Sequence, residues 1–124
     1  NGTGSEAKFN YAERMCIDGA GNIYVAEYGN NRIRKITPSG VVSDFAGSGK
    51  GGSANGTGAQ ASFFGPLAIS FDGSGNFYVV EVRYANQIRK ITAAGVVSNF
   101  ASTLSNTDGF DMCIDQSGNI YIPD

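Results

Sequence analysis

Acidic side chains recur at one position of a repeated segment in this chain, at Glu27, Glu81 and Asp124. Carboxylates that converge from several strands are typical ligands of a hard divalent cation, or the acid and base of a hydrolase. In a repeat protein, such residues more often anchor loops or pair with a neighbouring arginine, here Arg32 or Arg83. We interpret the three acids first as anchors and keep a metal-dependent enzyme as an alternative.

Polar and aromatic side chains follow these acids, and they differ between the copies of the segment. Variation on a constant scaffold is how loops acquire specificity, and this mixture suits contact with a protein, a glycan or a polar small molecule. The predicted ligand-binding residues are Glu27, Tyr28, Asn30, Asn31, Arg32, Glu81, Arg83, Tyr84, Asn86 and Asp124. The sequence predicts no catalytic residue, metal ligand or cofactor.

Three aspartates, Asp18, Asp72 and Asp115, precede glycine-containing turns that end in asparagine. A calcium-binding EF-hand loop would need more oxygen ligands and a distal glutamate. We expect instead that each carboxylate accepts hydrogen bonds from the turn, where glycine and asparagine tolerate a positive φ.

Two basic pairs, Arg34-Lys35 and Arg89-Lys90, fall inside predicted strands, where successive side chains point to opposite faces. They are therefore predicted to be structural or solvent-exposed. The formal charge of −2 and the pI near 5.0 also show that the chain has no overall excess of positive charge, which a nucleic-acid-binding protein typically has. No nucleic-acid partner is predicted, and no apolar run is long enough for membrane insertion.

Two cysteines, Cys16 and Cys113, occupy matching positions of different repeats. In separate structural units they are too far apart for the geometry of a disulfide. Each is predicted to be a small, buried, free thiol.

An internal repeat defines the elements that position these residues. The segment DGAGNIYVAE at 18–27 returns as DGSGNFYVVE at 72–81, with seven of ten positions identical. IRKITPSGVVSDFA at 33–46 returns as IRKITAAGVVSNFA at 88–101, with eleven of fourteen identical, and MCIDGAGNIY at 15–24 returns as MCIDQSGNIY at 112–121. Gly2-Thr3-Gly4 also recurs as Gly56-Thr57-Gly58.

Four short strands are predicted in one repeat, at 15–18, 22–27, 32–37 and 41–45, because each is rich in β-branched or aromatic residues. Their connections have hairpin length and contain Gly, Asn or Pro, so neighbouring strands should be antiparallel. The central strands are apolar on both faces, as in a sheet covered on both sides. Four-stranded sheets stacked about an axis meet that condition, so we predict an all-β fold, a β-propeller fragment.

The predicted organisation places a leading loop at 1–14, a first blade at 15–46, an inter-blade crossing at 47–66, a second blade at 67–101, a second crossing at 102–111 and the first two strands of a third blade at 112–124. So few blades cannot close a ring. We expect either a fragment of a longer propeller or a unit completed by further copies of the chain.

The run DGAGNIYVAE followed by NNRIRKI closely resembles the NHL repeat, named for an Asn-His-Leu at this loop. Asn31 stands in place of that His, and the second copy has Asn86-Gln87-Ile88. The resemblance implies a ring, commonly of six blades, whose inner strands line a central channel. The chain has no His, so it cannot supply the zinc-bound histidines of amidating-lyase propellers or a Ser-His-Asp triad. A carboxylate-and-Asn metal site like that of lactonase propellers would draw ligands from several blades.

The function predicted from these features is a noncatalytic binding scaffold, part of a larger propeller that recognises a protein, glycan or small ligand. A metal-dependent hydrolase or lyase with carboxylates at the channel mouth is one alternative. A structural module that assembles into a ring or array is the other. Glycosylation sequons at Asn1 and Asn55 are compatible with a secreted or cell-surface protein.

Overall fold

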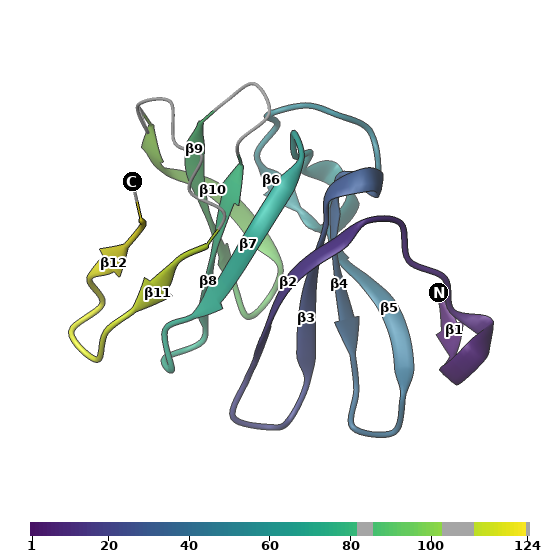
Figure 1. Cartoon of the computed structure of the whole chain (residues 1–124). Helices are drawn as coiled ribbons and strands as arrows, with labels where there is room; N and C mark the ends of the chain where they lie inside the picture. Colours follow the sequence, from purple (N-terminus) through teal and green to yellow (C-terminus); the bar gives the residue numbers. More distant parts are fainter. Residues whose placement is uncertain (82–85, 103–110, 124) are drawn as a thin grey trace.

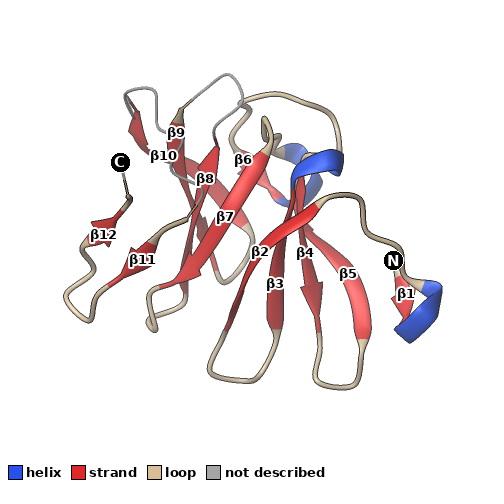
Figure 2. Ribbon diagram, in the orientation of Figure 1, coloured by secondary structure: helices blue, strands red, loops and turns tan. Residues whose placement is uncertain are grey.

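The structure of the chain is a computed structural model, and it describes residues 1–81, 86–102 and 111–123. Within these ranges the chain forms antiparallel strands joined by turns, with short 3-10 helices only in the connections (Figure 2). These helices are η1 (Gly4–Glu6), η2 (Tyr28–Asn30) and η3 (Gly58–Gln60). No helix of the described residues has the length and apolar character to span a membrane.

The first sheet contains the four strands predicted for one repeat and one more. Its strands are β1 (Gly2–Thr3), β2 (Ala12–Ile17), β3 (Ile23–Glu27), β4 (Arg32–Ile36) and β5 (Val41–Ala46). They pair antiparallel in the order β1-β5-β4-β3-β2, so β2 forms one edge and the two-residue β1 forms the other. The meander from β2 to β5 is the predicted blade.

The second sheet repeats this arrangement and is followed by a two-stranded sheet. Its strands are β6 (Gly56–Thr57), β7 (Pro66–Phe71), β8 (Asn76–Glu81), β9 (Gln87–Thr92) and β10 (Val96–Ser102), in the order β6-β10-β9-β8-β7. Strands β11 (Cys113–Ile114) and β12 (Ile120–Tyr121) pair with each other. Figure 1 shows the three sheets as successive blades, with β11 and β12 beyond the second sheet.

The short strands β1 and β6 were not predicted. The segment 47–66, predicted to be an inter-blade crossing, contains β6, which pairs with β10 at the outer edge of the second sheet. Gly56 has a φ of +144°, and a Cβ there would lie 2.9 Å from the Cβ of Gln60, so this turn requires glycine. The repeated Gly-Thr-Gly was the sequence signal for this strand.

The main apolar core lies between the two large sheets. Tyr24, Ala26 and Ile33 of the first sheet face Phe77 and other residues of the second, and the Tyr24 and Phe77 ring centroids are 4.2 Å apart. A second core joins the opposite face of the second sheet to Met112 and the apolar residues of the third. The second blade therefore packs one face against the first blade and the other face against the third.

The Asp-Gly turns have the structure predicted for them. Asp18 Oδ1 accepts hydrogen bonds from the backbone N of Ala20 at 3.0 Å and of Asn22 at 2.9 Å. Its Oδ2 accepts from Asn22 Nδ2 at 2.9 Å and from the Tyr24 hydroxyl at 3.1 Å. Asp72 and Asp115 make the equivalent turn contacts. These carboxylates shape hairpins.

Phe63→Ala should lower the free energy of unfolding by about 3–5 kcal/mol, because Phe63 is fully buried between the sheets and its loss leaves a cavity. The matched control is Phe100→Ala, which removes a half-exposed ring that packs on Tyr78 and should cost about 1 kcal/mol. Urea unfolding followed by circular dichroism measures both. Equal losses would contradict this description of the core.

Candidate functional site

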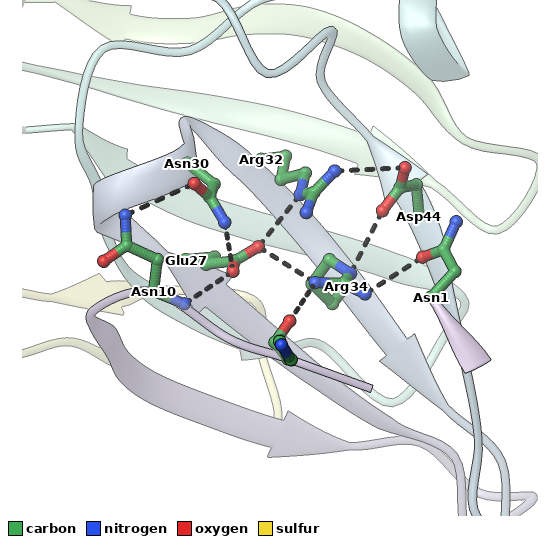
Figure 3. Close-up of polar contacts among 8 residues, drawn as sticks. Asn1, Asn10, Glu27, Asn30, Arg32, Arg34 and Asp44 are labelled. Carbon is green, nitrogen blue, oxygen red and sulfur yellow. Dashed lines mark hydrogen bonds and ion pairs between the residues drawn. The ribbon is translucent and has the colours of Figure 1, made fainter. Parts of the chain in front are cut away.

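Glu27, at the end of β3, is fully buried, and each of its carboxylate oxygens accepts two hydrogen bonds (Figure 3). Oε1 accepts from the backbone N of Asn10 at 2.8 Å and from Asn30 Nδ2 at 2.6 Å. Oε2 accepts from Arg32 Nε at 2.9 Å and from Arg34 Nη1 at 3.3 Å. A carboxylate offers about four acceptor sites. The chain itself therefore occupies those of Glu27.

Arg34, in the middle of β4, is also fully buried and connects distant segments of the blade. Its Nη1 donates to the carbonyl oxygen of Lys8 at 3.1 Å, and its Nη2 donates to Asn1 Oδ1 at 3.0 Å. Its Nε lies 3.0 Å from Asp44 Oδ1, as an ion pair without the alignment of a hydrogen bond. One guanidinium thus holds the segment that precedes β2 against β4 and β5.

The second blade repeats this buried pair with Glu81 and Arg89, both fully buried. Glu81 Oε1 accepts from the backbone N of Phe64 at 2.6 Å. Its Oε2 accepts from Gln87 Nε2 at 2.6 Å and from Arg89 Nη1 at 3.4 Å. The predicted anchoring role of the repeated acids is therefore what the structure shows for Glu27 and Glu81.

Arg89 binds the connection that leads into its blade. Nη1 donates to the carbonyl oxygen of Ser62 at 2.9 Å, and Nη2 donates to the carbonyl oxygen of Ala54 at 2.9 Å and to Asn55 Oδ1 at 2.8 Å. The asparagine of each glycosylation sequon thus accepts a hydrogen bond from a buried arginine. This structural role explains why an asparagine is found at this position in both repeats. The arginines of both basic pairs are structural, as predicted.

The two networks differ by a charge-balanced exchange. In the first blade, Arg32 Nη1 lies 3.3 Å from Asp44 Oδ2. Gln87 and Asn99 occupy the equivalent positions in the second blade. In the strand register, Asn99 lies opposite Arg89, as Asp44 lies opposite Arg34. One positive and one negative charge are replaced together, so each network remains formally neutral. Neutrality limits the free energy lost by burying these charges.

The pKa values of the two glutamates shift in opposite directions. Burial raises the pKa of Glu27, but the hydrogen bonds from its four donors together outweigh burial and hold the pKa below 4.5. Burial dominates at Glu81, where a single arginine faces the carboxylate, and its pKa lies above 4.5. Arg32, which Gln87 replaces in the second blade, contributes the largest of the hydrogen-bond effects that lower the pKa of Glu27.

The predicted ligand-binding residues that follow these acids take several positions. Tyr28 and Asn30 lie in η2, and Asn31 adopts a left-handed conformation with a φ of 52°. Asn31 Oδ1 accepts from the backbone N of Gly65 at 2.9 Å, so it connects the first blade to the segment that enters the second. Asn86 has a similar φ of 41°. The remaining predicted positions, Arg83, Tyr84 and Asp124, lie outside the described residues.

A hollow of about 450 Å³ lies where the inner strands β2, β7 and β11 meet, as the resemblance to a propeller with a central channel implies, but none of its lining residues was predicted as a site residue. Ser70 Oγ donates to the carbonyl oxygen of Met112 at 3.1 Å, and Arg14 Nε lies 4.0 Å from Asp111 Oδ2 across this region. The residues that line it are Arg14, Met15, Cys16, Ile17, Ile69, Ser70, Phe71, Asp111, Met112, Cys113 and Ile114. One sequence signal could have indicated this hollow: the three copies of the repeat carry different residues at one equivalent position, namely Arg14, Ala68 and Asp111.

Both cysteines line this hollow and are free thiols, as predicted. The expectation that both are buried is wrong for Cys113, which lies exposed on the two-residue strand β11. Cys16 is half-buried, and burial raises the pKa of its thiol to about 12. Within residues 1–81, 86–102 and 111–123, no three His, Cys, Asp or Glu side chains gather as a metal site.

Comparison with known proteins agrees with the repeated geometry. A family model described as the NHL repeat matches residues 9–36. These residues form an NHL repeat. The identity between the two copies extends this description to the equivalent residues of the second blade. No curated protein sequence matches the chain.

Solved structures share the arrangement of the blades. A structural genomics protein of unknown function from Bacteroides thetaiotaomicron is 29% identical with a TM-score of 0.69, over 82% of this chain and 29% of that one. A virginiamycin B lyase from Staphylococcus aureus, a catalytically inactive H270A form with quinupristin, is 15% identical with a TM-score of 0.67, over 94% of this chain and 35% of that one. A streptogramin B lyase is 18% identical with a TM-score of 0.64, over 87% and 32%. The fold is that of a β-propeller, and the chain spans about a third of the length of these structures.

Glu27→Gln should lower the free energy of unfolding by about 3–5 kcal/mol, because it leaves the buried Arg34 without a full counter-charge. The control is the double variant Arg32→Gln and Asp44→Asn, which reproduces the charges of the second blade and should stay within about 1 kcal/mol of wild type. Urea denaturation measures both. A Glu27→Gln loss no larger than that of the double variant would contradict a structural role for the pair.

The stability effects of the two glutamates should respond oppositely to pH. A lowered pKa means that ionised Glu27 stabilises the fold above pH 4.5 and that this contribution is lost as the pH falls through the folded pKa. A raised pKa means that ionisation of Glu81 reduces stability as the pH rises above 4.5. Glu27→Gln should therefore cost more at pH 7 than in acid, and Glu81→Gln less. Parallel trends in unfolding measured across this range would refute the assignment.

Proposed function

We propose that the chain is part of a noncatalytic binding scaffold whose ligand occupies the hollow between β2, β7 and β11. The observation that carries this proposal is that the repeated polar residues and the residues that face the hollow are different sets of side chains. The repeated Glu and Arg residues form hydrogen bonds within the blades. The inner strands line an open hollow, and each blade contributes different residues to it. Its volume of about 450 Å³ lies in the range of small-ligand sites.

The lining favours a small, partly apolar ligand or peptide segment with a charged end. Apolar side chains such as Met15, Phe71 and Met112 line the hollow together with polar ones. Arg14 and Asp111 are half-exposed and 4.0 Å apart, so a charged ligand group can compete for either of them at little cost. The inner strands β2 and β7 are sheet edges and add backbone polar groups.

A metal-dependent enzyme is less well supported by the same geometry. The likeness to lyases at 15% and 18% identity concerns the fold, and function depends on the site that a fold carries. Glu27 and Glu81 would have to release buried hydrogen bonds before either could bind an ion. If a divalent ion copurified with the intact protein and a chelator lowered its melting temperature, the enzyme proposal would gain support over the scaffold.

The binding proposal is tested by NMR of the intact protein with small aromatic carboxylates and aromatic amines as probes. Amide shift changes should concentrate in 14–17, 69–71 and 111–114. Ser70→Phe, which fills the hollow, should abolish them, whereas Ser98→Phe on the exposed face of β10 should not. Shift changes confined to the loop at 28–31, or unchanged binding in Ser70→Phe, would contradict the proposed site.

A further inference from the structure

Two opposite charges face each other across the hollow between β2, β7 and β11. Arg14 Nε lies 4.0 Å from Asp111 Oδ2, and the two side chains are 51% and 61% exposed. These two atoms are too far apart for a hydrogen bond. An ion pair with this exposure generally contributes little to stability. Both charged groups can therefore turn from each other to a ligand without unfolding the chain.

The repeat places the two charges on different blades. Arg14, Ala68 and Asp111 occupy one equivalent position in the first, second and third copies of the repeat. Because Ala68 has only a methyl group, the second blade places no charged or hydrogen-bonding side chain at this position. The hollow is therefore bipolar, with a positive group from the first blade and a negative group from the third.

The local backbone directs both groups. The register of β2 against β3 shifts between Ala12 and Met15, so Arg14 lies in a β-bulge. Such bulges change the direction of a side chain and are common beside active sites. Asp111 Oδ1 accepts a hydrogen bond from the backbone N of Met112 at 2.9 Å, and Oδ2 is the oxygen near Arg14. The carboxylate is thus oriented before any ligand binds.

We propose that the ligand of this hollow is a zwitterion of the α-amino-acid type with an apolar side chain, an inference that rests on the proposed binding function. Its carboxylate binds Arg14, which can donate two parallel hydrogen bonds, and its ammonium binds Asp111. The apolar side chain contacts the apolar part of the lining, such as Phe71 and Met112.

The spacing of the two protein charges favours a zwitterion over a ligand with one charge. A carboxylate alone is attracted by Arg14 and repelled by Asp111 at a similar distance, and an ammonium alone meets the reverse. In an α-amino acid both charged groups are attached to one carbon, so their separation is similar to that of the protein pair. Each ligand charge then lies beside its opposite, and the two dipoles are antiparallel.

The test titrates the intact protein with three related probes and follows amide shifts by NMR. L-phenylalanine carries both charges, 3-phenylpropanoate only the carboxylate and 2-phenylethylamine only the ammonium. L-phenylalanine should shift the amides of 14–17, 69–71 and 111–114 and bind about ten-fold more tightly than either relative, because both of its charges are paired. Glycine should bind more weakly than L-phenylalanine, since it has no side chain to contact the apolar lining.

Single variants separate the two charges. Arg14→Gln should weaken binding of L-phenylalanine about ten-fold and leave 2-phenylethylamine bound. Asp111→Asn should weaken L-phenylalanine to a similar degree and leave 3-phenylpropanoate bound. The matched control is Lys50→Gln, which removes an exposed charge outside the hollow and should change none of these affinities. Circular dichroism checks that each variant is folded.

The outcomes distinguish this inference from the proposed function. If 3-phenylpropanoate or 2-phenylethylamine binds in the hollow as tightly as L-phenylalanine, the zwitterion inference is overturned and the binding site stands. Binding of L-phenylalanine that is unchanged in both Arg14→Gln and Asp111→Asn overturns it equally. If no probe shifts the amides of the hollow, the proposed binding function fails together with this inference.

Discussion

A glutamate–arginine pair buried at the end of the second strand is the constraint on which each blade depends. Burying two charges is favourable only when both are paired and their remaining hydrogen-bonding groups are satisfied. In both blades the chain meets this condition by bringing the preceding segment to the pair, through the backbone N of Asn10 or Phe64 and the carbonyl oxygen of Lys8 or Ser62. The pair therefore determines the path of the backbone as well as the charge balance.

Because of this constraint, the residues of the buried pair are the same in both blades, whereas surface positions outside it differ. The glutamate, the arginine and the asparagine at the start of each repeat are the same in both blades, and the arginine donates hydrogen bonds to the other two. Positions that face the hollow between the inner strands differ, as Arg14, Ala68 and Asp111 do. A scaffold whose polar groups are bonded internally can vary such positions with little effect on its stability.

The repeat made much of the fold predictable, because near-identical segments must adopt equivalent structures. The four main strands, the Asp18-type turns and the anchoring of Glu27 followed from composition and spacing. The pairing of Glu27 with Arg32 was also predicted, and Arg32 Nε lies 2.9 Å from Glu27 Oε2, but the second, fully buried partner Arg34 was not predicted. Pairing with Arg34 joins alternate positions of adjacent strands, and only the strand register reveals which side chains share a face. The residues that line the hollow were missed for a related reason, since they are distant in sequence.

A double-mutant cycle on Glu27 and Arg34 tests the dependence of the blade on its buried pair most directly. Each single change, Glu27→Gln and Arg34→Met, should lower the free energy of unfolding by about 3–5 kcal/mol, because each removes one partner of a buried ion pair. The double variant should lose no more than either single variant, with a coupling free energy above about 1.5 kcal/mol. Additive losses would show that the two side chains act independently and would contradict the account.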